Sequence, residues 1–137
     1  MAKSSKKPRW VVLKFGGTSV ATVGNWGVIR DLVRARLTEG FRVVVVHSAL
    51  AGISNKLISM LERATNGEPD ELLQEISQRH LQLGAEMGLD ADALIGPYLV
   101  ELGQLVAGVR LVREVSPRVH AKVLAMGELM ATTLGAA

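Results

Sequence analysis

Two short apolar runs on either side of a helical pattern constrain the fold more than any other feature of the sequence. Residues 10–15 and 41–47 are strand-length, and the second run contains four consecutive valines, which is typical of a central strand in a parallel sheet. Between them, apolar residues recur with the spacing of one helix face, and Gly40 marks the end of that helix. The sequence therefore predicts a right-handed βαβ unit whose first strand is buried on both faces.

The remainder of the chain has helical spacing throughout. It predicts four further helices over residues 55–64, 69–87, 90–114 and 117–134. Asp90 and Ser116 are the expected N-caps, and Gly96-Pro97 is expected to break or kink the third of these helices. Two strands and five helices give an α/β fold with a helix-rich second half. Because two parallel strands do not make a stable sheet, we expect the chain to be part of a larger domain.

The charge is concentrated at the N-terminus. Residues 1–9 hold four of the 16 basic residues, which leaves 12 basic against 13 acidic residues in the rest of the chain. A nearly neutral body has no basic face for nucleic acid, so residues 1–9 are expected to form a disordered basic leader and residues 10–137 the folded domain.

Composition also excludes some classes of protein. The chain has no cysteine, which excludes a disulfide framework and a thiol nucleophile and fits the cytoplasm. No apolar run approaches the ~18 residues that cross a bilayer, so we expect no membrane segment. His80 and His120 have no second ligand at metal-binding spacing and are expected at the surface or in pairing roles, and we predict no protein metal site. His47 is expected to be packed, and Trp10 and Trp26 are expected core or edge anchors.

The first apolar run leads directly into a loop with the features of a phosphate site. Gly16 and Gly17 allow the backbone to turn sharply and bring its N–H groups close to phosphate oxygens. Lys14 supplies a positive charge, while Thr18 and Ser19 supply donors and an expected helix N-cap. Because the lysine precedes the glycines, the loop is neither a Walker A loop nor a Gly-x-Gly-x-x-Gly dinucleotide turn.

The second run also ends in a turn of small residues, His47 to Asn55. Ligands of open α/β sheets bind at the carboxyl ends of the strands, so this turn is expected beside the glycine loop. The alternative is a plain strand-to-helix turn with an N-cap serine, without a binding role.

A third candidate segment lies in the last predicted helix. A glycine at position 127, inside this helix, destabilises the helix by about 1 kcal/mol relative to alanine. Its presence is explained if a backbone or a ligand must pass close to it. Glu128 and Thr132 stand one turn apart on one face. The alternative for Glu128 is a paired structural charge on an otherwise apolar helix.

These segments together resemble one protein family. Residues 14–20, Lys-Phe-Gly-Gly-Thr-Ser-Val, resemble the start of the amino acid kinase family and of its aspartokinase branch in particular. Residues 48–55 resemble the branch's Ser-Ala-x-Ala-Gly-x-Thr-Asn segment, with Ser54 in place of a threonine that contacts the amino acid substrate. Residues 127–131 resemble Gly-Glu-x-x-Ser, with Ala131 in place of the serine, whose hydroxyl is therefore absent or supplied by Thr132.

The order and spacing of the three segments agree with this family from residue 10 onward. The long helical stretch between residues 69 and 114 separates the chain from the shorter carbamate, uridylate and acetylglutamate kinases. The leader and the Met-Gly-Glu segment are also similar to those of fused aspartokinase and diaminopimelate decarboxylase proteins.

The resemblance implies a partial three-layer α/β/α fold that transfers the γ-phosphoryl group of ATP to the side-chain carboxylate of L-aspartate, the first step of lysine, threonine and methionine synthesis. It implies that Lys14 is catalytic, that Ser54 and Glu128 bind the amino acid, with Glu128 on its ammonium group, and that the nucleotide is bound by Lys14, Phe15, Gly16, Gly17, Thr18, Ser19 and Ser48. Mg²⁺ would be held through the nucleotide phosphates. The family's remaining site residues follow residue 137, so residues 1–137 alone are expected to be inactive. A cytoplasmic homo-oligomer is expected.

Two other classes of function remain open at this point. One is another enzyme with the amino acid kinase fold, such as a glutamate or uridylate kinase. The other is a non-catalytic binding or assembly module, for which Lys14 and Glu128 would be dispensable.

Overall fold

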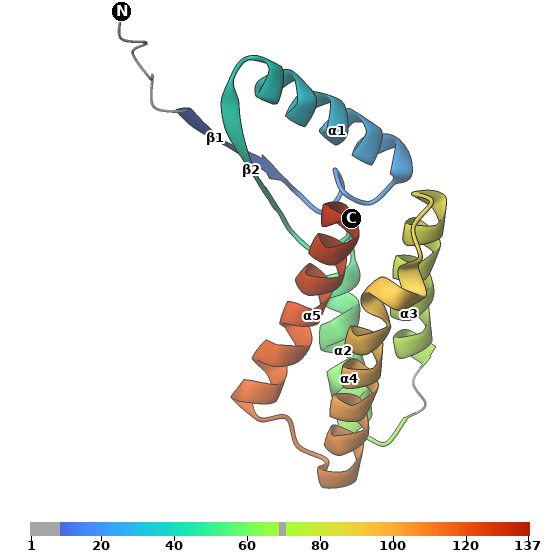
Figure 1. Ribbon diagram of the computed structural model, residues 1–137. Coiled ribbons are helices and arrows are strands. Elements are labelled where there is room, and N and C mark those ends of the chain that lie inside the picture. The colour runs from blue at the N-terminus through green and yellow to red at the C-terminus, as the bar shows by residue number, and fades with distance from the viewer. Residues whose placement is uncertain (1–8, 69–70) are drawn as a thin grey trace, which may run out of the picture.

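The computed structural model describes residues 9–68 and 71–137 and begins with a strand, a helix and a strand (Figure 1). Strands β1 (Arg9–Phe15) and β2 (Phe41–His47) pair in parallel and are joined by helix α1 (Val23–Thr38). This confirms the predicted parallel pair. Strand β1 includes Arg9, the last residue of the expected leader, and the other leader residues lie outside the described part of the chain.

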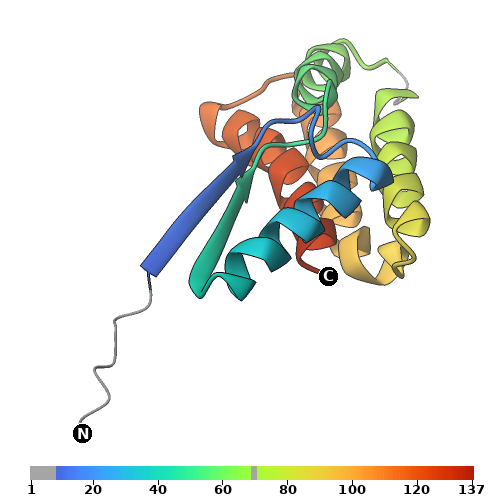
Figure 2. The same cartoon turned by 90° about the horizontal axis from the view of Figure 1, so that it is seen from above.

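Four helices follow the second strand, as the sequence predicts. They are α2 (Ile53–Thr65), α3 (Glu71–Glu86), α4 (Ala91–Val112) and α5 (Pro117–Ala136). The start expected at residue 69 for the second of them falls on residues that are not described. The four helices pack together as a bundle at the carboxyl ends of the strands, while the sheet and α1 extend away from it (Figures 1 and 2).

The predicted N-caps of the last two helices are confirmed. The side chain of Asp90 accepts a hydrogen bond from the amide of Ala93 at 3.1 Å, and Ser116 Oγ accepts one from the amide of Val119 at 3.2 Å. Helix α4 is not broken at Gly96-Pro97, because its packing against the three other bundle helices outweighs the amide hydrogen bond that proline cannot make.

Helix α4 also corrects the expectation about apolar length. By length and composition alone, this one helix of the described residues could cross a membrane. In the structure, however, α4 packs against α2, α3 and α5, and Ile95, Leu102 and Val106 are fully buried in the bundle. It is therefore accounted for as a core helix.

The hydrophobic core lies inside the bundle rather than on the sheet. Each of the four bundle helices contributes side chains with no exposed surface, among them Leu57, Ile76, Val106, Val123 and Met130. The strands, in contrast, are open, and Val12 is 62 % exposed. Residues 9–68 and 71–137 supply only two strands and one helix beside them. The expectation that the first strand is buried on both faces is therefore wrong for this part of the fold.

Alternation along the strands separates a covered face from an open one. Phe15 packs against the core. Trp10, Val12 and Lys14 point to the other face, where Arg42 lies 5.4 Å from the centre of the Trp10 ring. Trp10 is thus an exposed edge residue. Lys14 pairs in register with Val46 at the carboxyl end of the sheet.

Candidate active site

The two turns that follow the strands lie side by side, as the sequence predicts. The amide of Ser48 donates to the carbonyl of Phe15 at 3.3 Å, and the amide of Ala51 donates to the carbonyl of Gly17 at 3.2 Å. The backbone of the glycine loop is therefore hydrogen-bonded directly to the backbone of the second turn.

The two adjacent glycines of the loop have different surroundings. A Cβ atom at Gly17 would lie 2.7 Å from the carbonyl oxygen of Ala49 and 3.1 Å from the amide nitrogen of Ala51. A Cβ atom at Gly16 would meet nothing within 4 Å. The close approach of the two turns thus requires glycine at position 17 only.

A polar hollow of about 340 Å³ lies between the two turns. It brings together four of the residues expected to bind ligands, Gly17, Thr18, Ser48 and Ser54. Within the described chain, the amides of Gly17 and Thr18 donate no hydrogen bond, so both can donate to a bound anion.

The start of α2 adds a second source of positive potential to this hollow. The N-cap residue is Gly52, with a φ of 80° and no side-chain cap hydrogen bond, and Ser54 and Asn55 of the first helical turn line the hollow. An uncapped helix N-terminus presents free amides and the positive end of the helix dipole. Ser54 is therefore not an N-cap, contrary to the plain-turn alternative.

The N-cap of α1 is also not where the sequence predicts it. Thr22, not Thr18 or Ser19, caps this helix, and its hydroxyl accepts from the amide of Asn25 at 3.2 Å. The prediction is wrong because the loop makes further tight turns before α1 begins, such as the hydrogen bond from the Ser19 amide to the Gly16 carbonyl.

The remaining loop residues lie outside the polar hollow. Phe15 and Ser19 line a separate hollow of about 190 Å³ beside α1. Lys14 is exposed, and none of the described ion pairs includes it, so its charge is available to a ligand.

Gly127 is closely approached by side chains, not by the backbone or ligand expected from the sequence. A Cβ atom there would lie 3.1 Å from Cγ2 of Ile53 and 3.2 Å from Cβ of Ala49, so α5 crosses directly against the second turn and the start of α2. The next residue, Glu128, is exposed and stands beside this crossing, outside the polar hollow itself. Thr132 is exposed one turn further along α5.

Helix α3 contributes a contact to the glycine loop that sequence reasoning missed. The guanidinium of Arg79 donates a hydrogen bond to the carbonyl of Ala21. The two residues are 58 positions apart, and no motif in the sequence links them.

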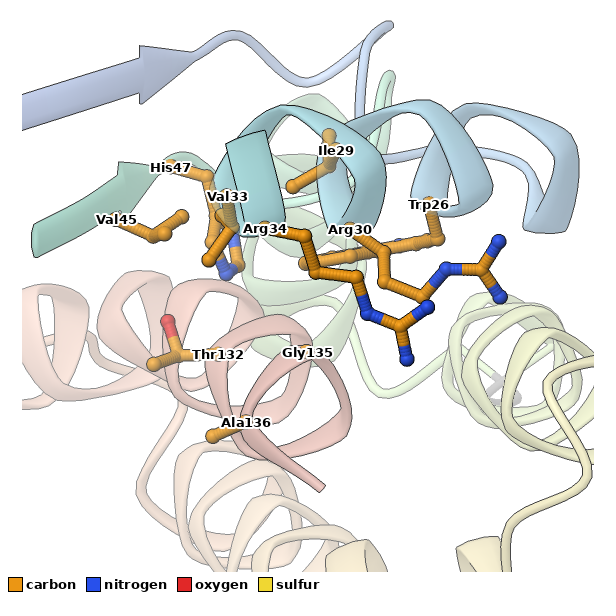
Figure 3. Close-up of a pocket in the computed structure, with 10 residues that line it drawn as sticks. All are labelled: Trp26, Ile29, Arg30, Val33, Arg34, Val45, His47, Thr132, Gly135 and Ala136. Carbon is orange, nitrogen blue, oxygen red and sulfur yellow. The ribbon is translucent and has the colours of Figure 1, made fainter. Parts of the chain in front are cut away.

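A more apolar hollow of about 420 Å³ lies between α1, β2 and the end of α5 (Figure 3). Trp26 and His47 meet there edge to face, with ring centres 5.3 Å apart, and a Cβ atom at Gly135 would lie 2.2 Å from the Trp26 ring. The expected packed state of His47 and anchoring role of Trp26 are confirmed. Of the candidate residues from the three sequence segments, Thr132 lines this hollow, whereas Lys14, Ser54 and Glu128 do not.

His80 is not at the surface, contrary to expectation. It is fully buried in the bundle, on the same stripe of α3 as Ile76 and Leu83, and its Nδ1–H donates to the carbonyl of Ile76 at 2.8 Å. No described atom is hydrogen-bonded to its Nε2. Burial lowers the pKa of His80 below 6.5, and the charge of neighbouring Arg79 acts in the same direction.

A lowered pKa makes the stability of the bundle depend on pH in a defined direction. Since the unfolded chain binds a proton near pH ~6.5 and the folded chain binds it only at a lower pH, protonation of the unfolded chain destabilises the fold as the pH falls below ~6.5. We expect the opening free energy of α3 to fall as the pH decreases below ~6.5, with a slope of up to about 1.4 kcal/mol per pH unit. Native-state amide exchange at several pH values measures it. His80→Leu should remove the slope, whereas His120→Gln, at an exposed site, should retain it; an unchanged slope in His80→Leu would contradict the assignment.

The described residues contain no group of three or more His, Cys, Asp or Glu side chains that could hold a metal ion.

Comparison with known proteins relates this geometry to one family. Residues 9–137 match the amino acid kinase family. The chain is 34 % identical over 138 residues to the chloroplastic aspartokinase 3 of Arabidopsis thaliana, covering 97 % of this chain and 24 % of that protein. It is 33 % identical over 143 residues to the aspartokinase of Schizosaccharomyces pombe, covering 93 % and 27 %.

A solved structure gives the same relation in three dimensions. The crystal structure of E. coli aspartokinase III in complex with aspartate and ADP superposes with a TM-score of 0.76 at 28 % sequence identity, over 93 % of this chain and 28 % of that one. The chain thus spans about a quarter of the length of the relatives that it matches.

Proposed function

The chain belongs to the amino acid kinase family, and on that basis we propose that it is the N-terminal part of the catalytic domain of an aspartate kinase. The proposed reaction transfers the γ-phosphoryl group of ATP to the side-chain carboxylate of L-aspartate and forms an acyl phosphate. The observation that carries the proposal is the polar hollow between the two strand-end turns, where free amides, hydroxyls and an uncapped helix N-terminus converge.

The chemistry needs electrostatic help rather than a base. A carboxylate with a pKa near ~3.9 is already ionised at pH 7, so no proton has to be removed from it. The difficulty is that two anions must be held in line while charge develops on the transferring oxygens. Lys14, the amides of Gly17 and Thr18 and the start of α2 can offset that repulsion.

We assign roles to individual residues on this basis. Thr18 and Ser48 would contact nucleotide phosphates with the loop backbone, and Ser54 and Glu128 would orient aspartate, with the Glu128 carboxylate on its ammonium group. Gly16, Phe15 and Ser19 would act through the shape of the loop. Mg²⁺, carried by the nucleotide, would neutralise phosphate charge when bound.

The chain covers about a quarter of the length of its relatives, and this partial coverage leads to further proposals. Residues 10–137 would form the first part of the domain, and the adenine pocket and the group that binds the substrate α-carboxylate would come from other parts of the complete enzyme. We therefore expect residues 1–137 alone to show no kinase turnover. A homo-oligomer in the cytoplasm is proposed for the complete enzyme, although the Arabidopsis relatives are chloroplastic.

A substrate panel on the complete gene product tests this function. We expect acyl phosphate formation, trapped as the hydroxamate, with L-aspartate and none with L-glutamate or uridylate. Glu128→Gln should raise KM for aspartate by on the order of tenfold or more with little change in KM for ATP, since a charged hydrogen bond contributes about 1.5–3 kcal/mol.

The control for Glu128→Gln is Glu114→Gln, at an exposed residue between α4 and α5, which should leave both constants unchanged. Phosphorylation of glutamate or uridylate instead of aspartate would favour another kinase of this fold. Absence of any turnover, with unchanged partner binding in the Glu128 variant, would favour an assembly module.

A further inference from the structure

The loop between β1 and α1 is held through its carbonyl groups. Asn25 Nδ2 donates to the carbonyl of Thr18 at 3.0 Å, and Trp26 Nε1 donates to the carbonyl of Val20 at 3.0 Å. Arg79 donates to the carbonyl of the next residue, Ala21. Three carbonyl groups within four consecutive residues are thus fixed by side chains outside the loop.

These donors do not constrain the loop in the same way. Asn25 and Trp26 belong to α1, the helix into which the loop leads, so their hydrogen bonds join the loop to its own continuation. Arg79 belongs to α3, in the bundle. Its hydrogen bond therefore fixes the end of the loop relative to the bundle. In the same way, the hydrogen bond from the Ala51 amide to the Gly17 carbonyl fixes the beginning of the loop relative to the second turn.

Arg79 is suited to this role by its charge and its surroundings. Hydrogen bonds from an ionised donor are about twice as strong as neutral ones, and the planar guanidinium loses little freedom when it makes one. The nearby acid Glu75 is paired with Lys56. No described carboxylate forms an ion pair with Arg79, so among the described residues its guanidinium has the Ala21 carbonyl as its hydrogen-bond partner.

We propose that Arg79 is a positioning residue, which holds the glycine loop in the place where its amides meet nucleotide phosphates. This inference rests on the proposed kinase function. Arg79 acts through the loop backbone and does not touch the reacting groups. Its loss should therefore affect nucleotide binding before the phosphoryl transfer step and should leave the aspartate site largely intact.

The test compares Arg79→Gln and Arg79→Lys with Arg63→Gln in the complete gene product, using Mg-ATP and L-aspartate. Arg63 is exposed on α2 and distant from the loop in sequence. We expect Arg79→Gln to raise KM and Kd for Mg-ATP about tenfold with KM for aspartate within about twofold. Arg79→Lys should recover most of the affinity, because it retains a charged donor, and Arg63→Gln should match the wild type.

A spectroscopic signal can report the position of the loop independently of catalytic activity. Since Trp26 donates to the Val20 carbonyl, its fluorescence reports the loop without nucleotide in a background where Trp10 and every other tryptophan of the complete gene product are replaced by phenylalanine. Arg79→Gln should shift the Trp26 emission and Arg79→Lys should restore it.

Failure of this proposal is distinguishable from failure of the proposed function. If the wild type does not phosphorylate aspartate, the function fails, while the Trp26 signal and Mg-ATP affinity still test the role of Arg79. If the wild type is active and Arg79→Gln binds Mg-ATP as the wild type does, the proposal is overturned. If Arg79→Gln does not fold, a folded Arg79→Lys with wild-type Trp26 emission and Mg-ATP affinity supports the proposal, and one with tenfold weaker affinity but unshifted emission overturns it.

Discussion

Replacing Lys14 by alanine in the complete gene product is expected to lower kcat/KM for aspartate phosphorylation by on the order of 10³-fold, or about 4 kcal/mol of transition-state stabilisation. Lys14 ends β1 on the open face of the sheet, exposed and outside every described ion pair. A charge that no described ion pair neutralises would be available to the transferring phosphoryl group of the proposed reaction. Steady-state kinetics with ATP and L-aspartate measure the loss.

Two controls define the meaning of that loss. Lys122→Ala removes a surface lysine that pairs with Glu101 between α5 and α4, and exposed pairs contribute about 0–1 kcal/mol, so its kinetics should stay near those of the wild type. Lys14→Arg keeps the charge but changes its geometry and should retain part of the activity. A Lys14→Ala enzyme with wild-type kcat/KM would contradict a catalytic role for this residue.

The parts of the fold that were predictable depend on neighbours in sequence. The valine run and the spacing of α1 predict a parallel pair because strand formation and helix spacing are local properties. Asp90 and Ser116 are correct N-caps for the same reason, since each bonds an amide three residues away. Thr22 was missed because several hydroxyl-bearing residues precede α1, and turn geometry, not composition, selects the one that caps the helix.

The parts that failed depend on partners distant in sequence. Apolar composition suits a buried strand, but burial of β1 requires covering elements that the described residues do not supply. His80 could have been placed correctly, because it follows Ile76 by four residues and precedes Leu83 by three, on the apolar stripe of its helix.

In the candidate site, too, features set by neighbours in sequence were predictable and features set by distant partners were not. Residues adjacent to the strand ends, such as Gly17, Ser48 and Ser54, could be grouped from the rule that parallel strands present their loops at one edge. The hydrogen bond from Arg79 to the Ala21 carbonyl could not be predicted, because it depends on how α3 packs against the rest of the fold.

Replacing Gly17 by alanine is expected to destabilise the domain by about 1–3 kcal/mol and to lower kcat/KM by on the order of 10²-fold. The new Cβ atom would lie 2.7 Å from the Ala49 carbonyl oxygen and 3.1 Å from the Ala51 amide nitrogen. Both are backbone atoms, so the methyl group cannot be accommodated by a side-chain rotation. The two turns must separate, which weakens the hydrogen bond from the Ala51 amide to the Gly17 carbonyl and widens the hollow that is proposed to hold the phosphates.

The neighbouring glycine supplies the matched control for stability. Gly16→Ala adds the same methyl group one residue earlier, where nothing lies within 4 Å, and Gly16 does not have a positive φ. Its free energy of unfolding should therefore be unchanged or raised by up to about 1 kcal/mol, because alanine restricts the unfolded chain. Thermal unfolding and steady-state kinetics of both variants distinguish an effect of loop flexibility from an effect of the contact between the two turns. If Gly16→Ala and Gly17→Ala are equally destabilised, general flexibility of the loop matters. If only Gly17→Ala is affected, the contact between the two turns is what shapes the site.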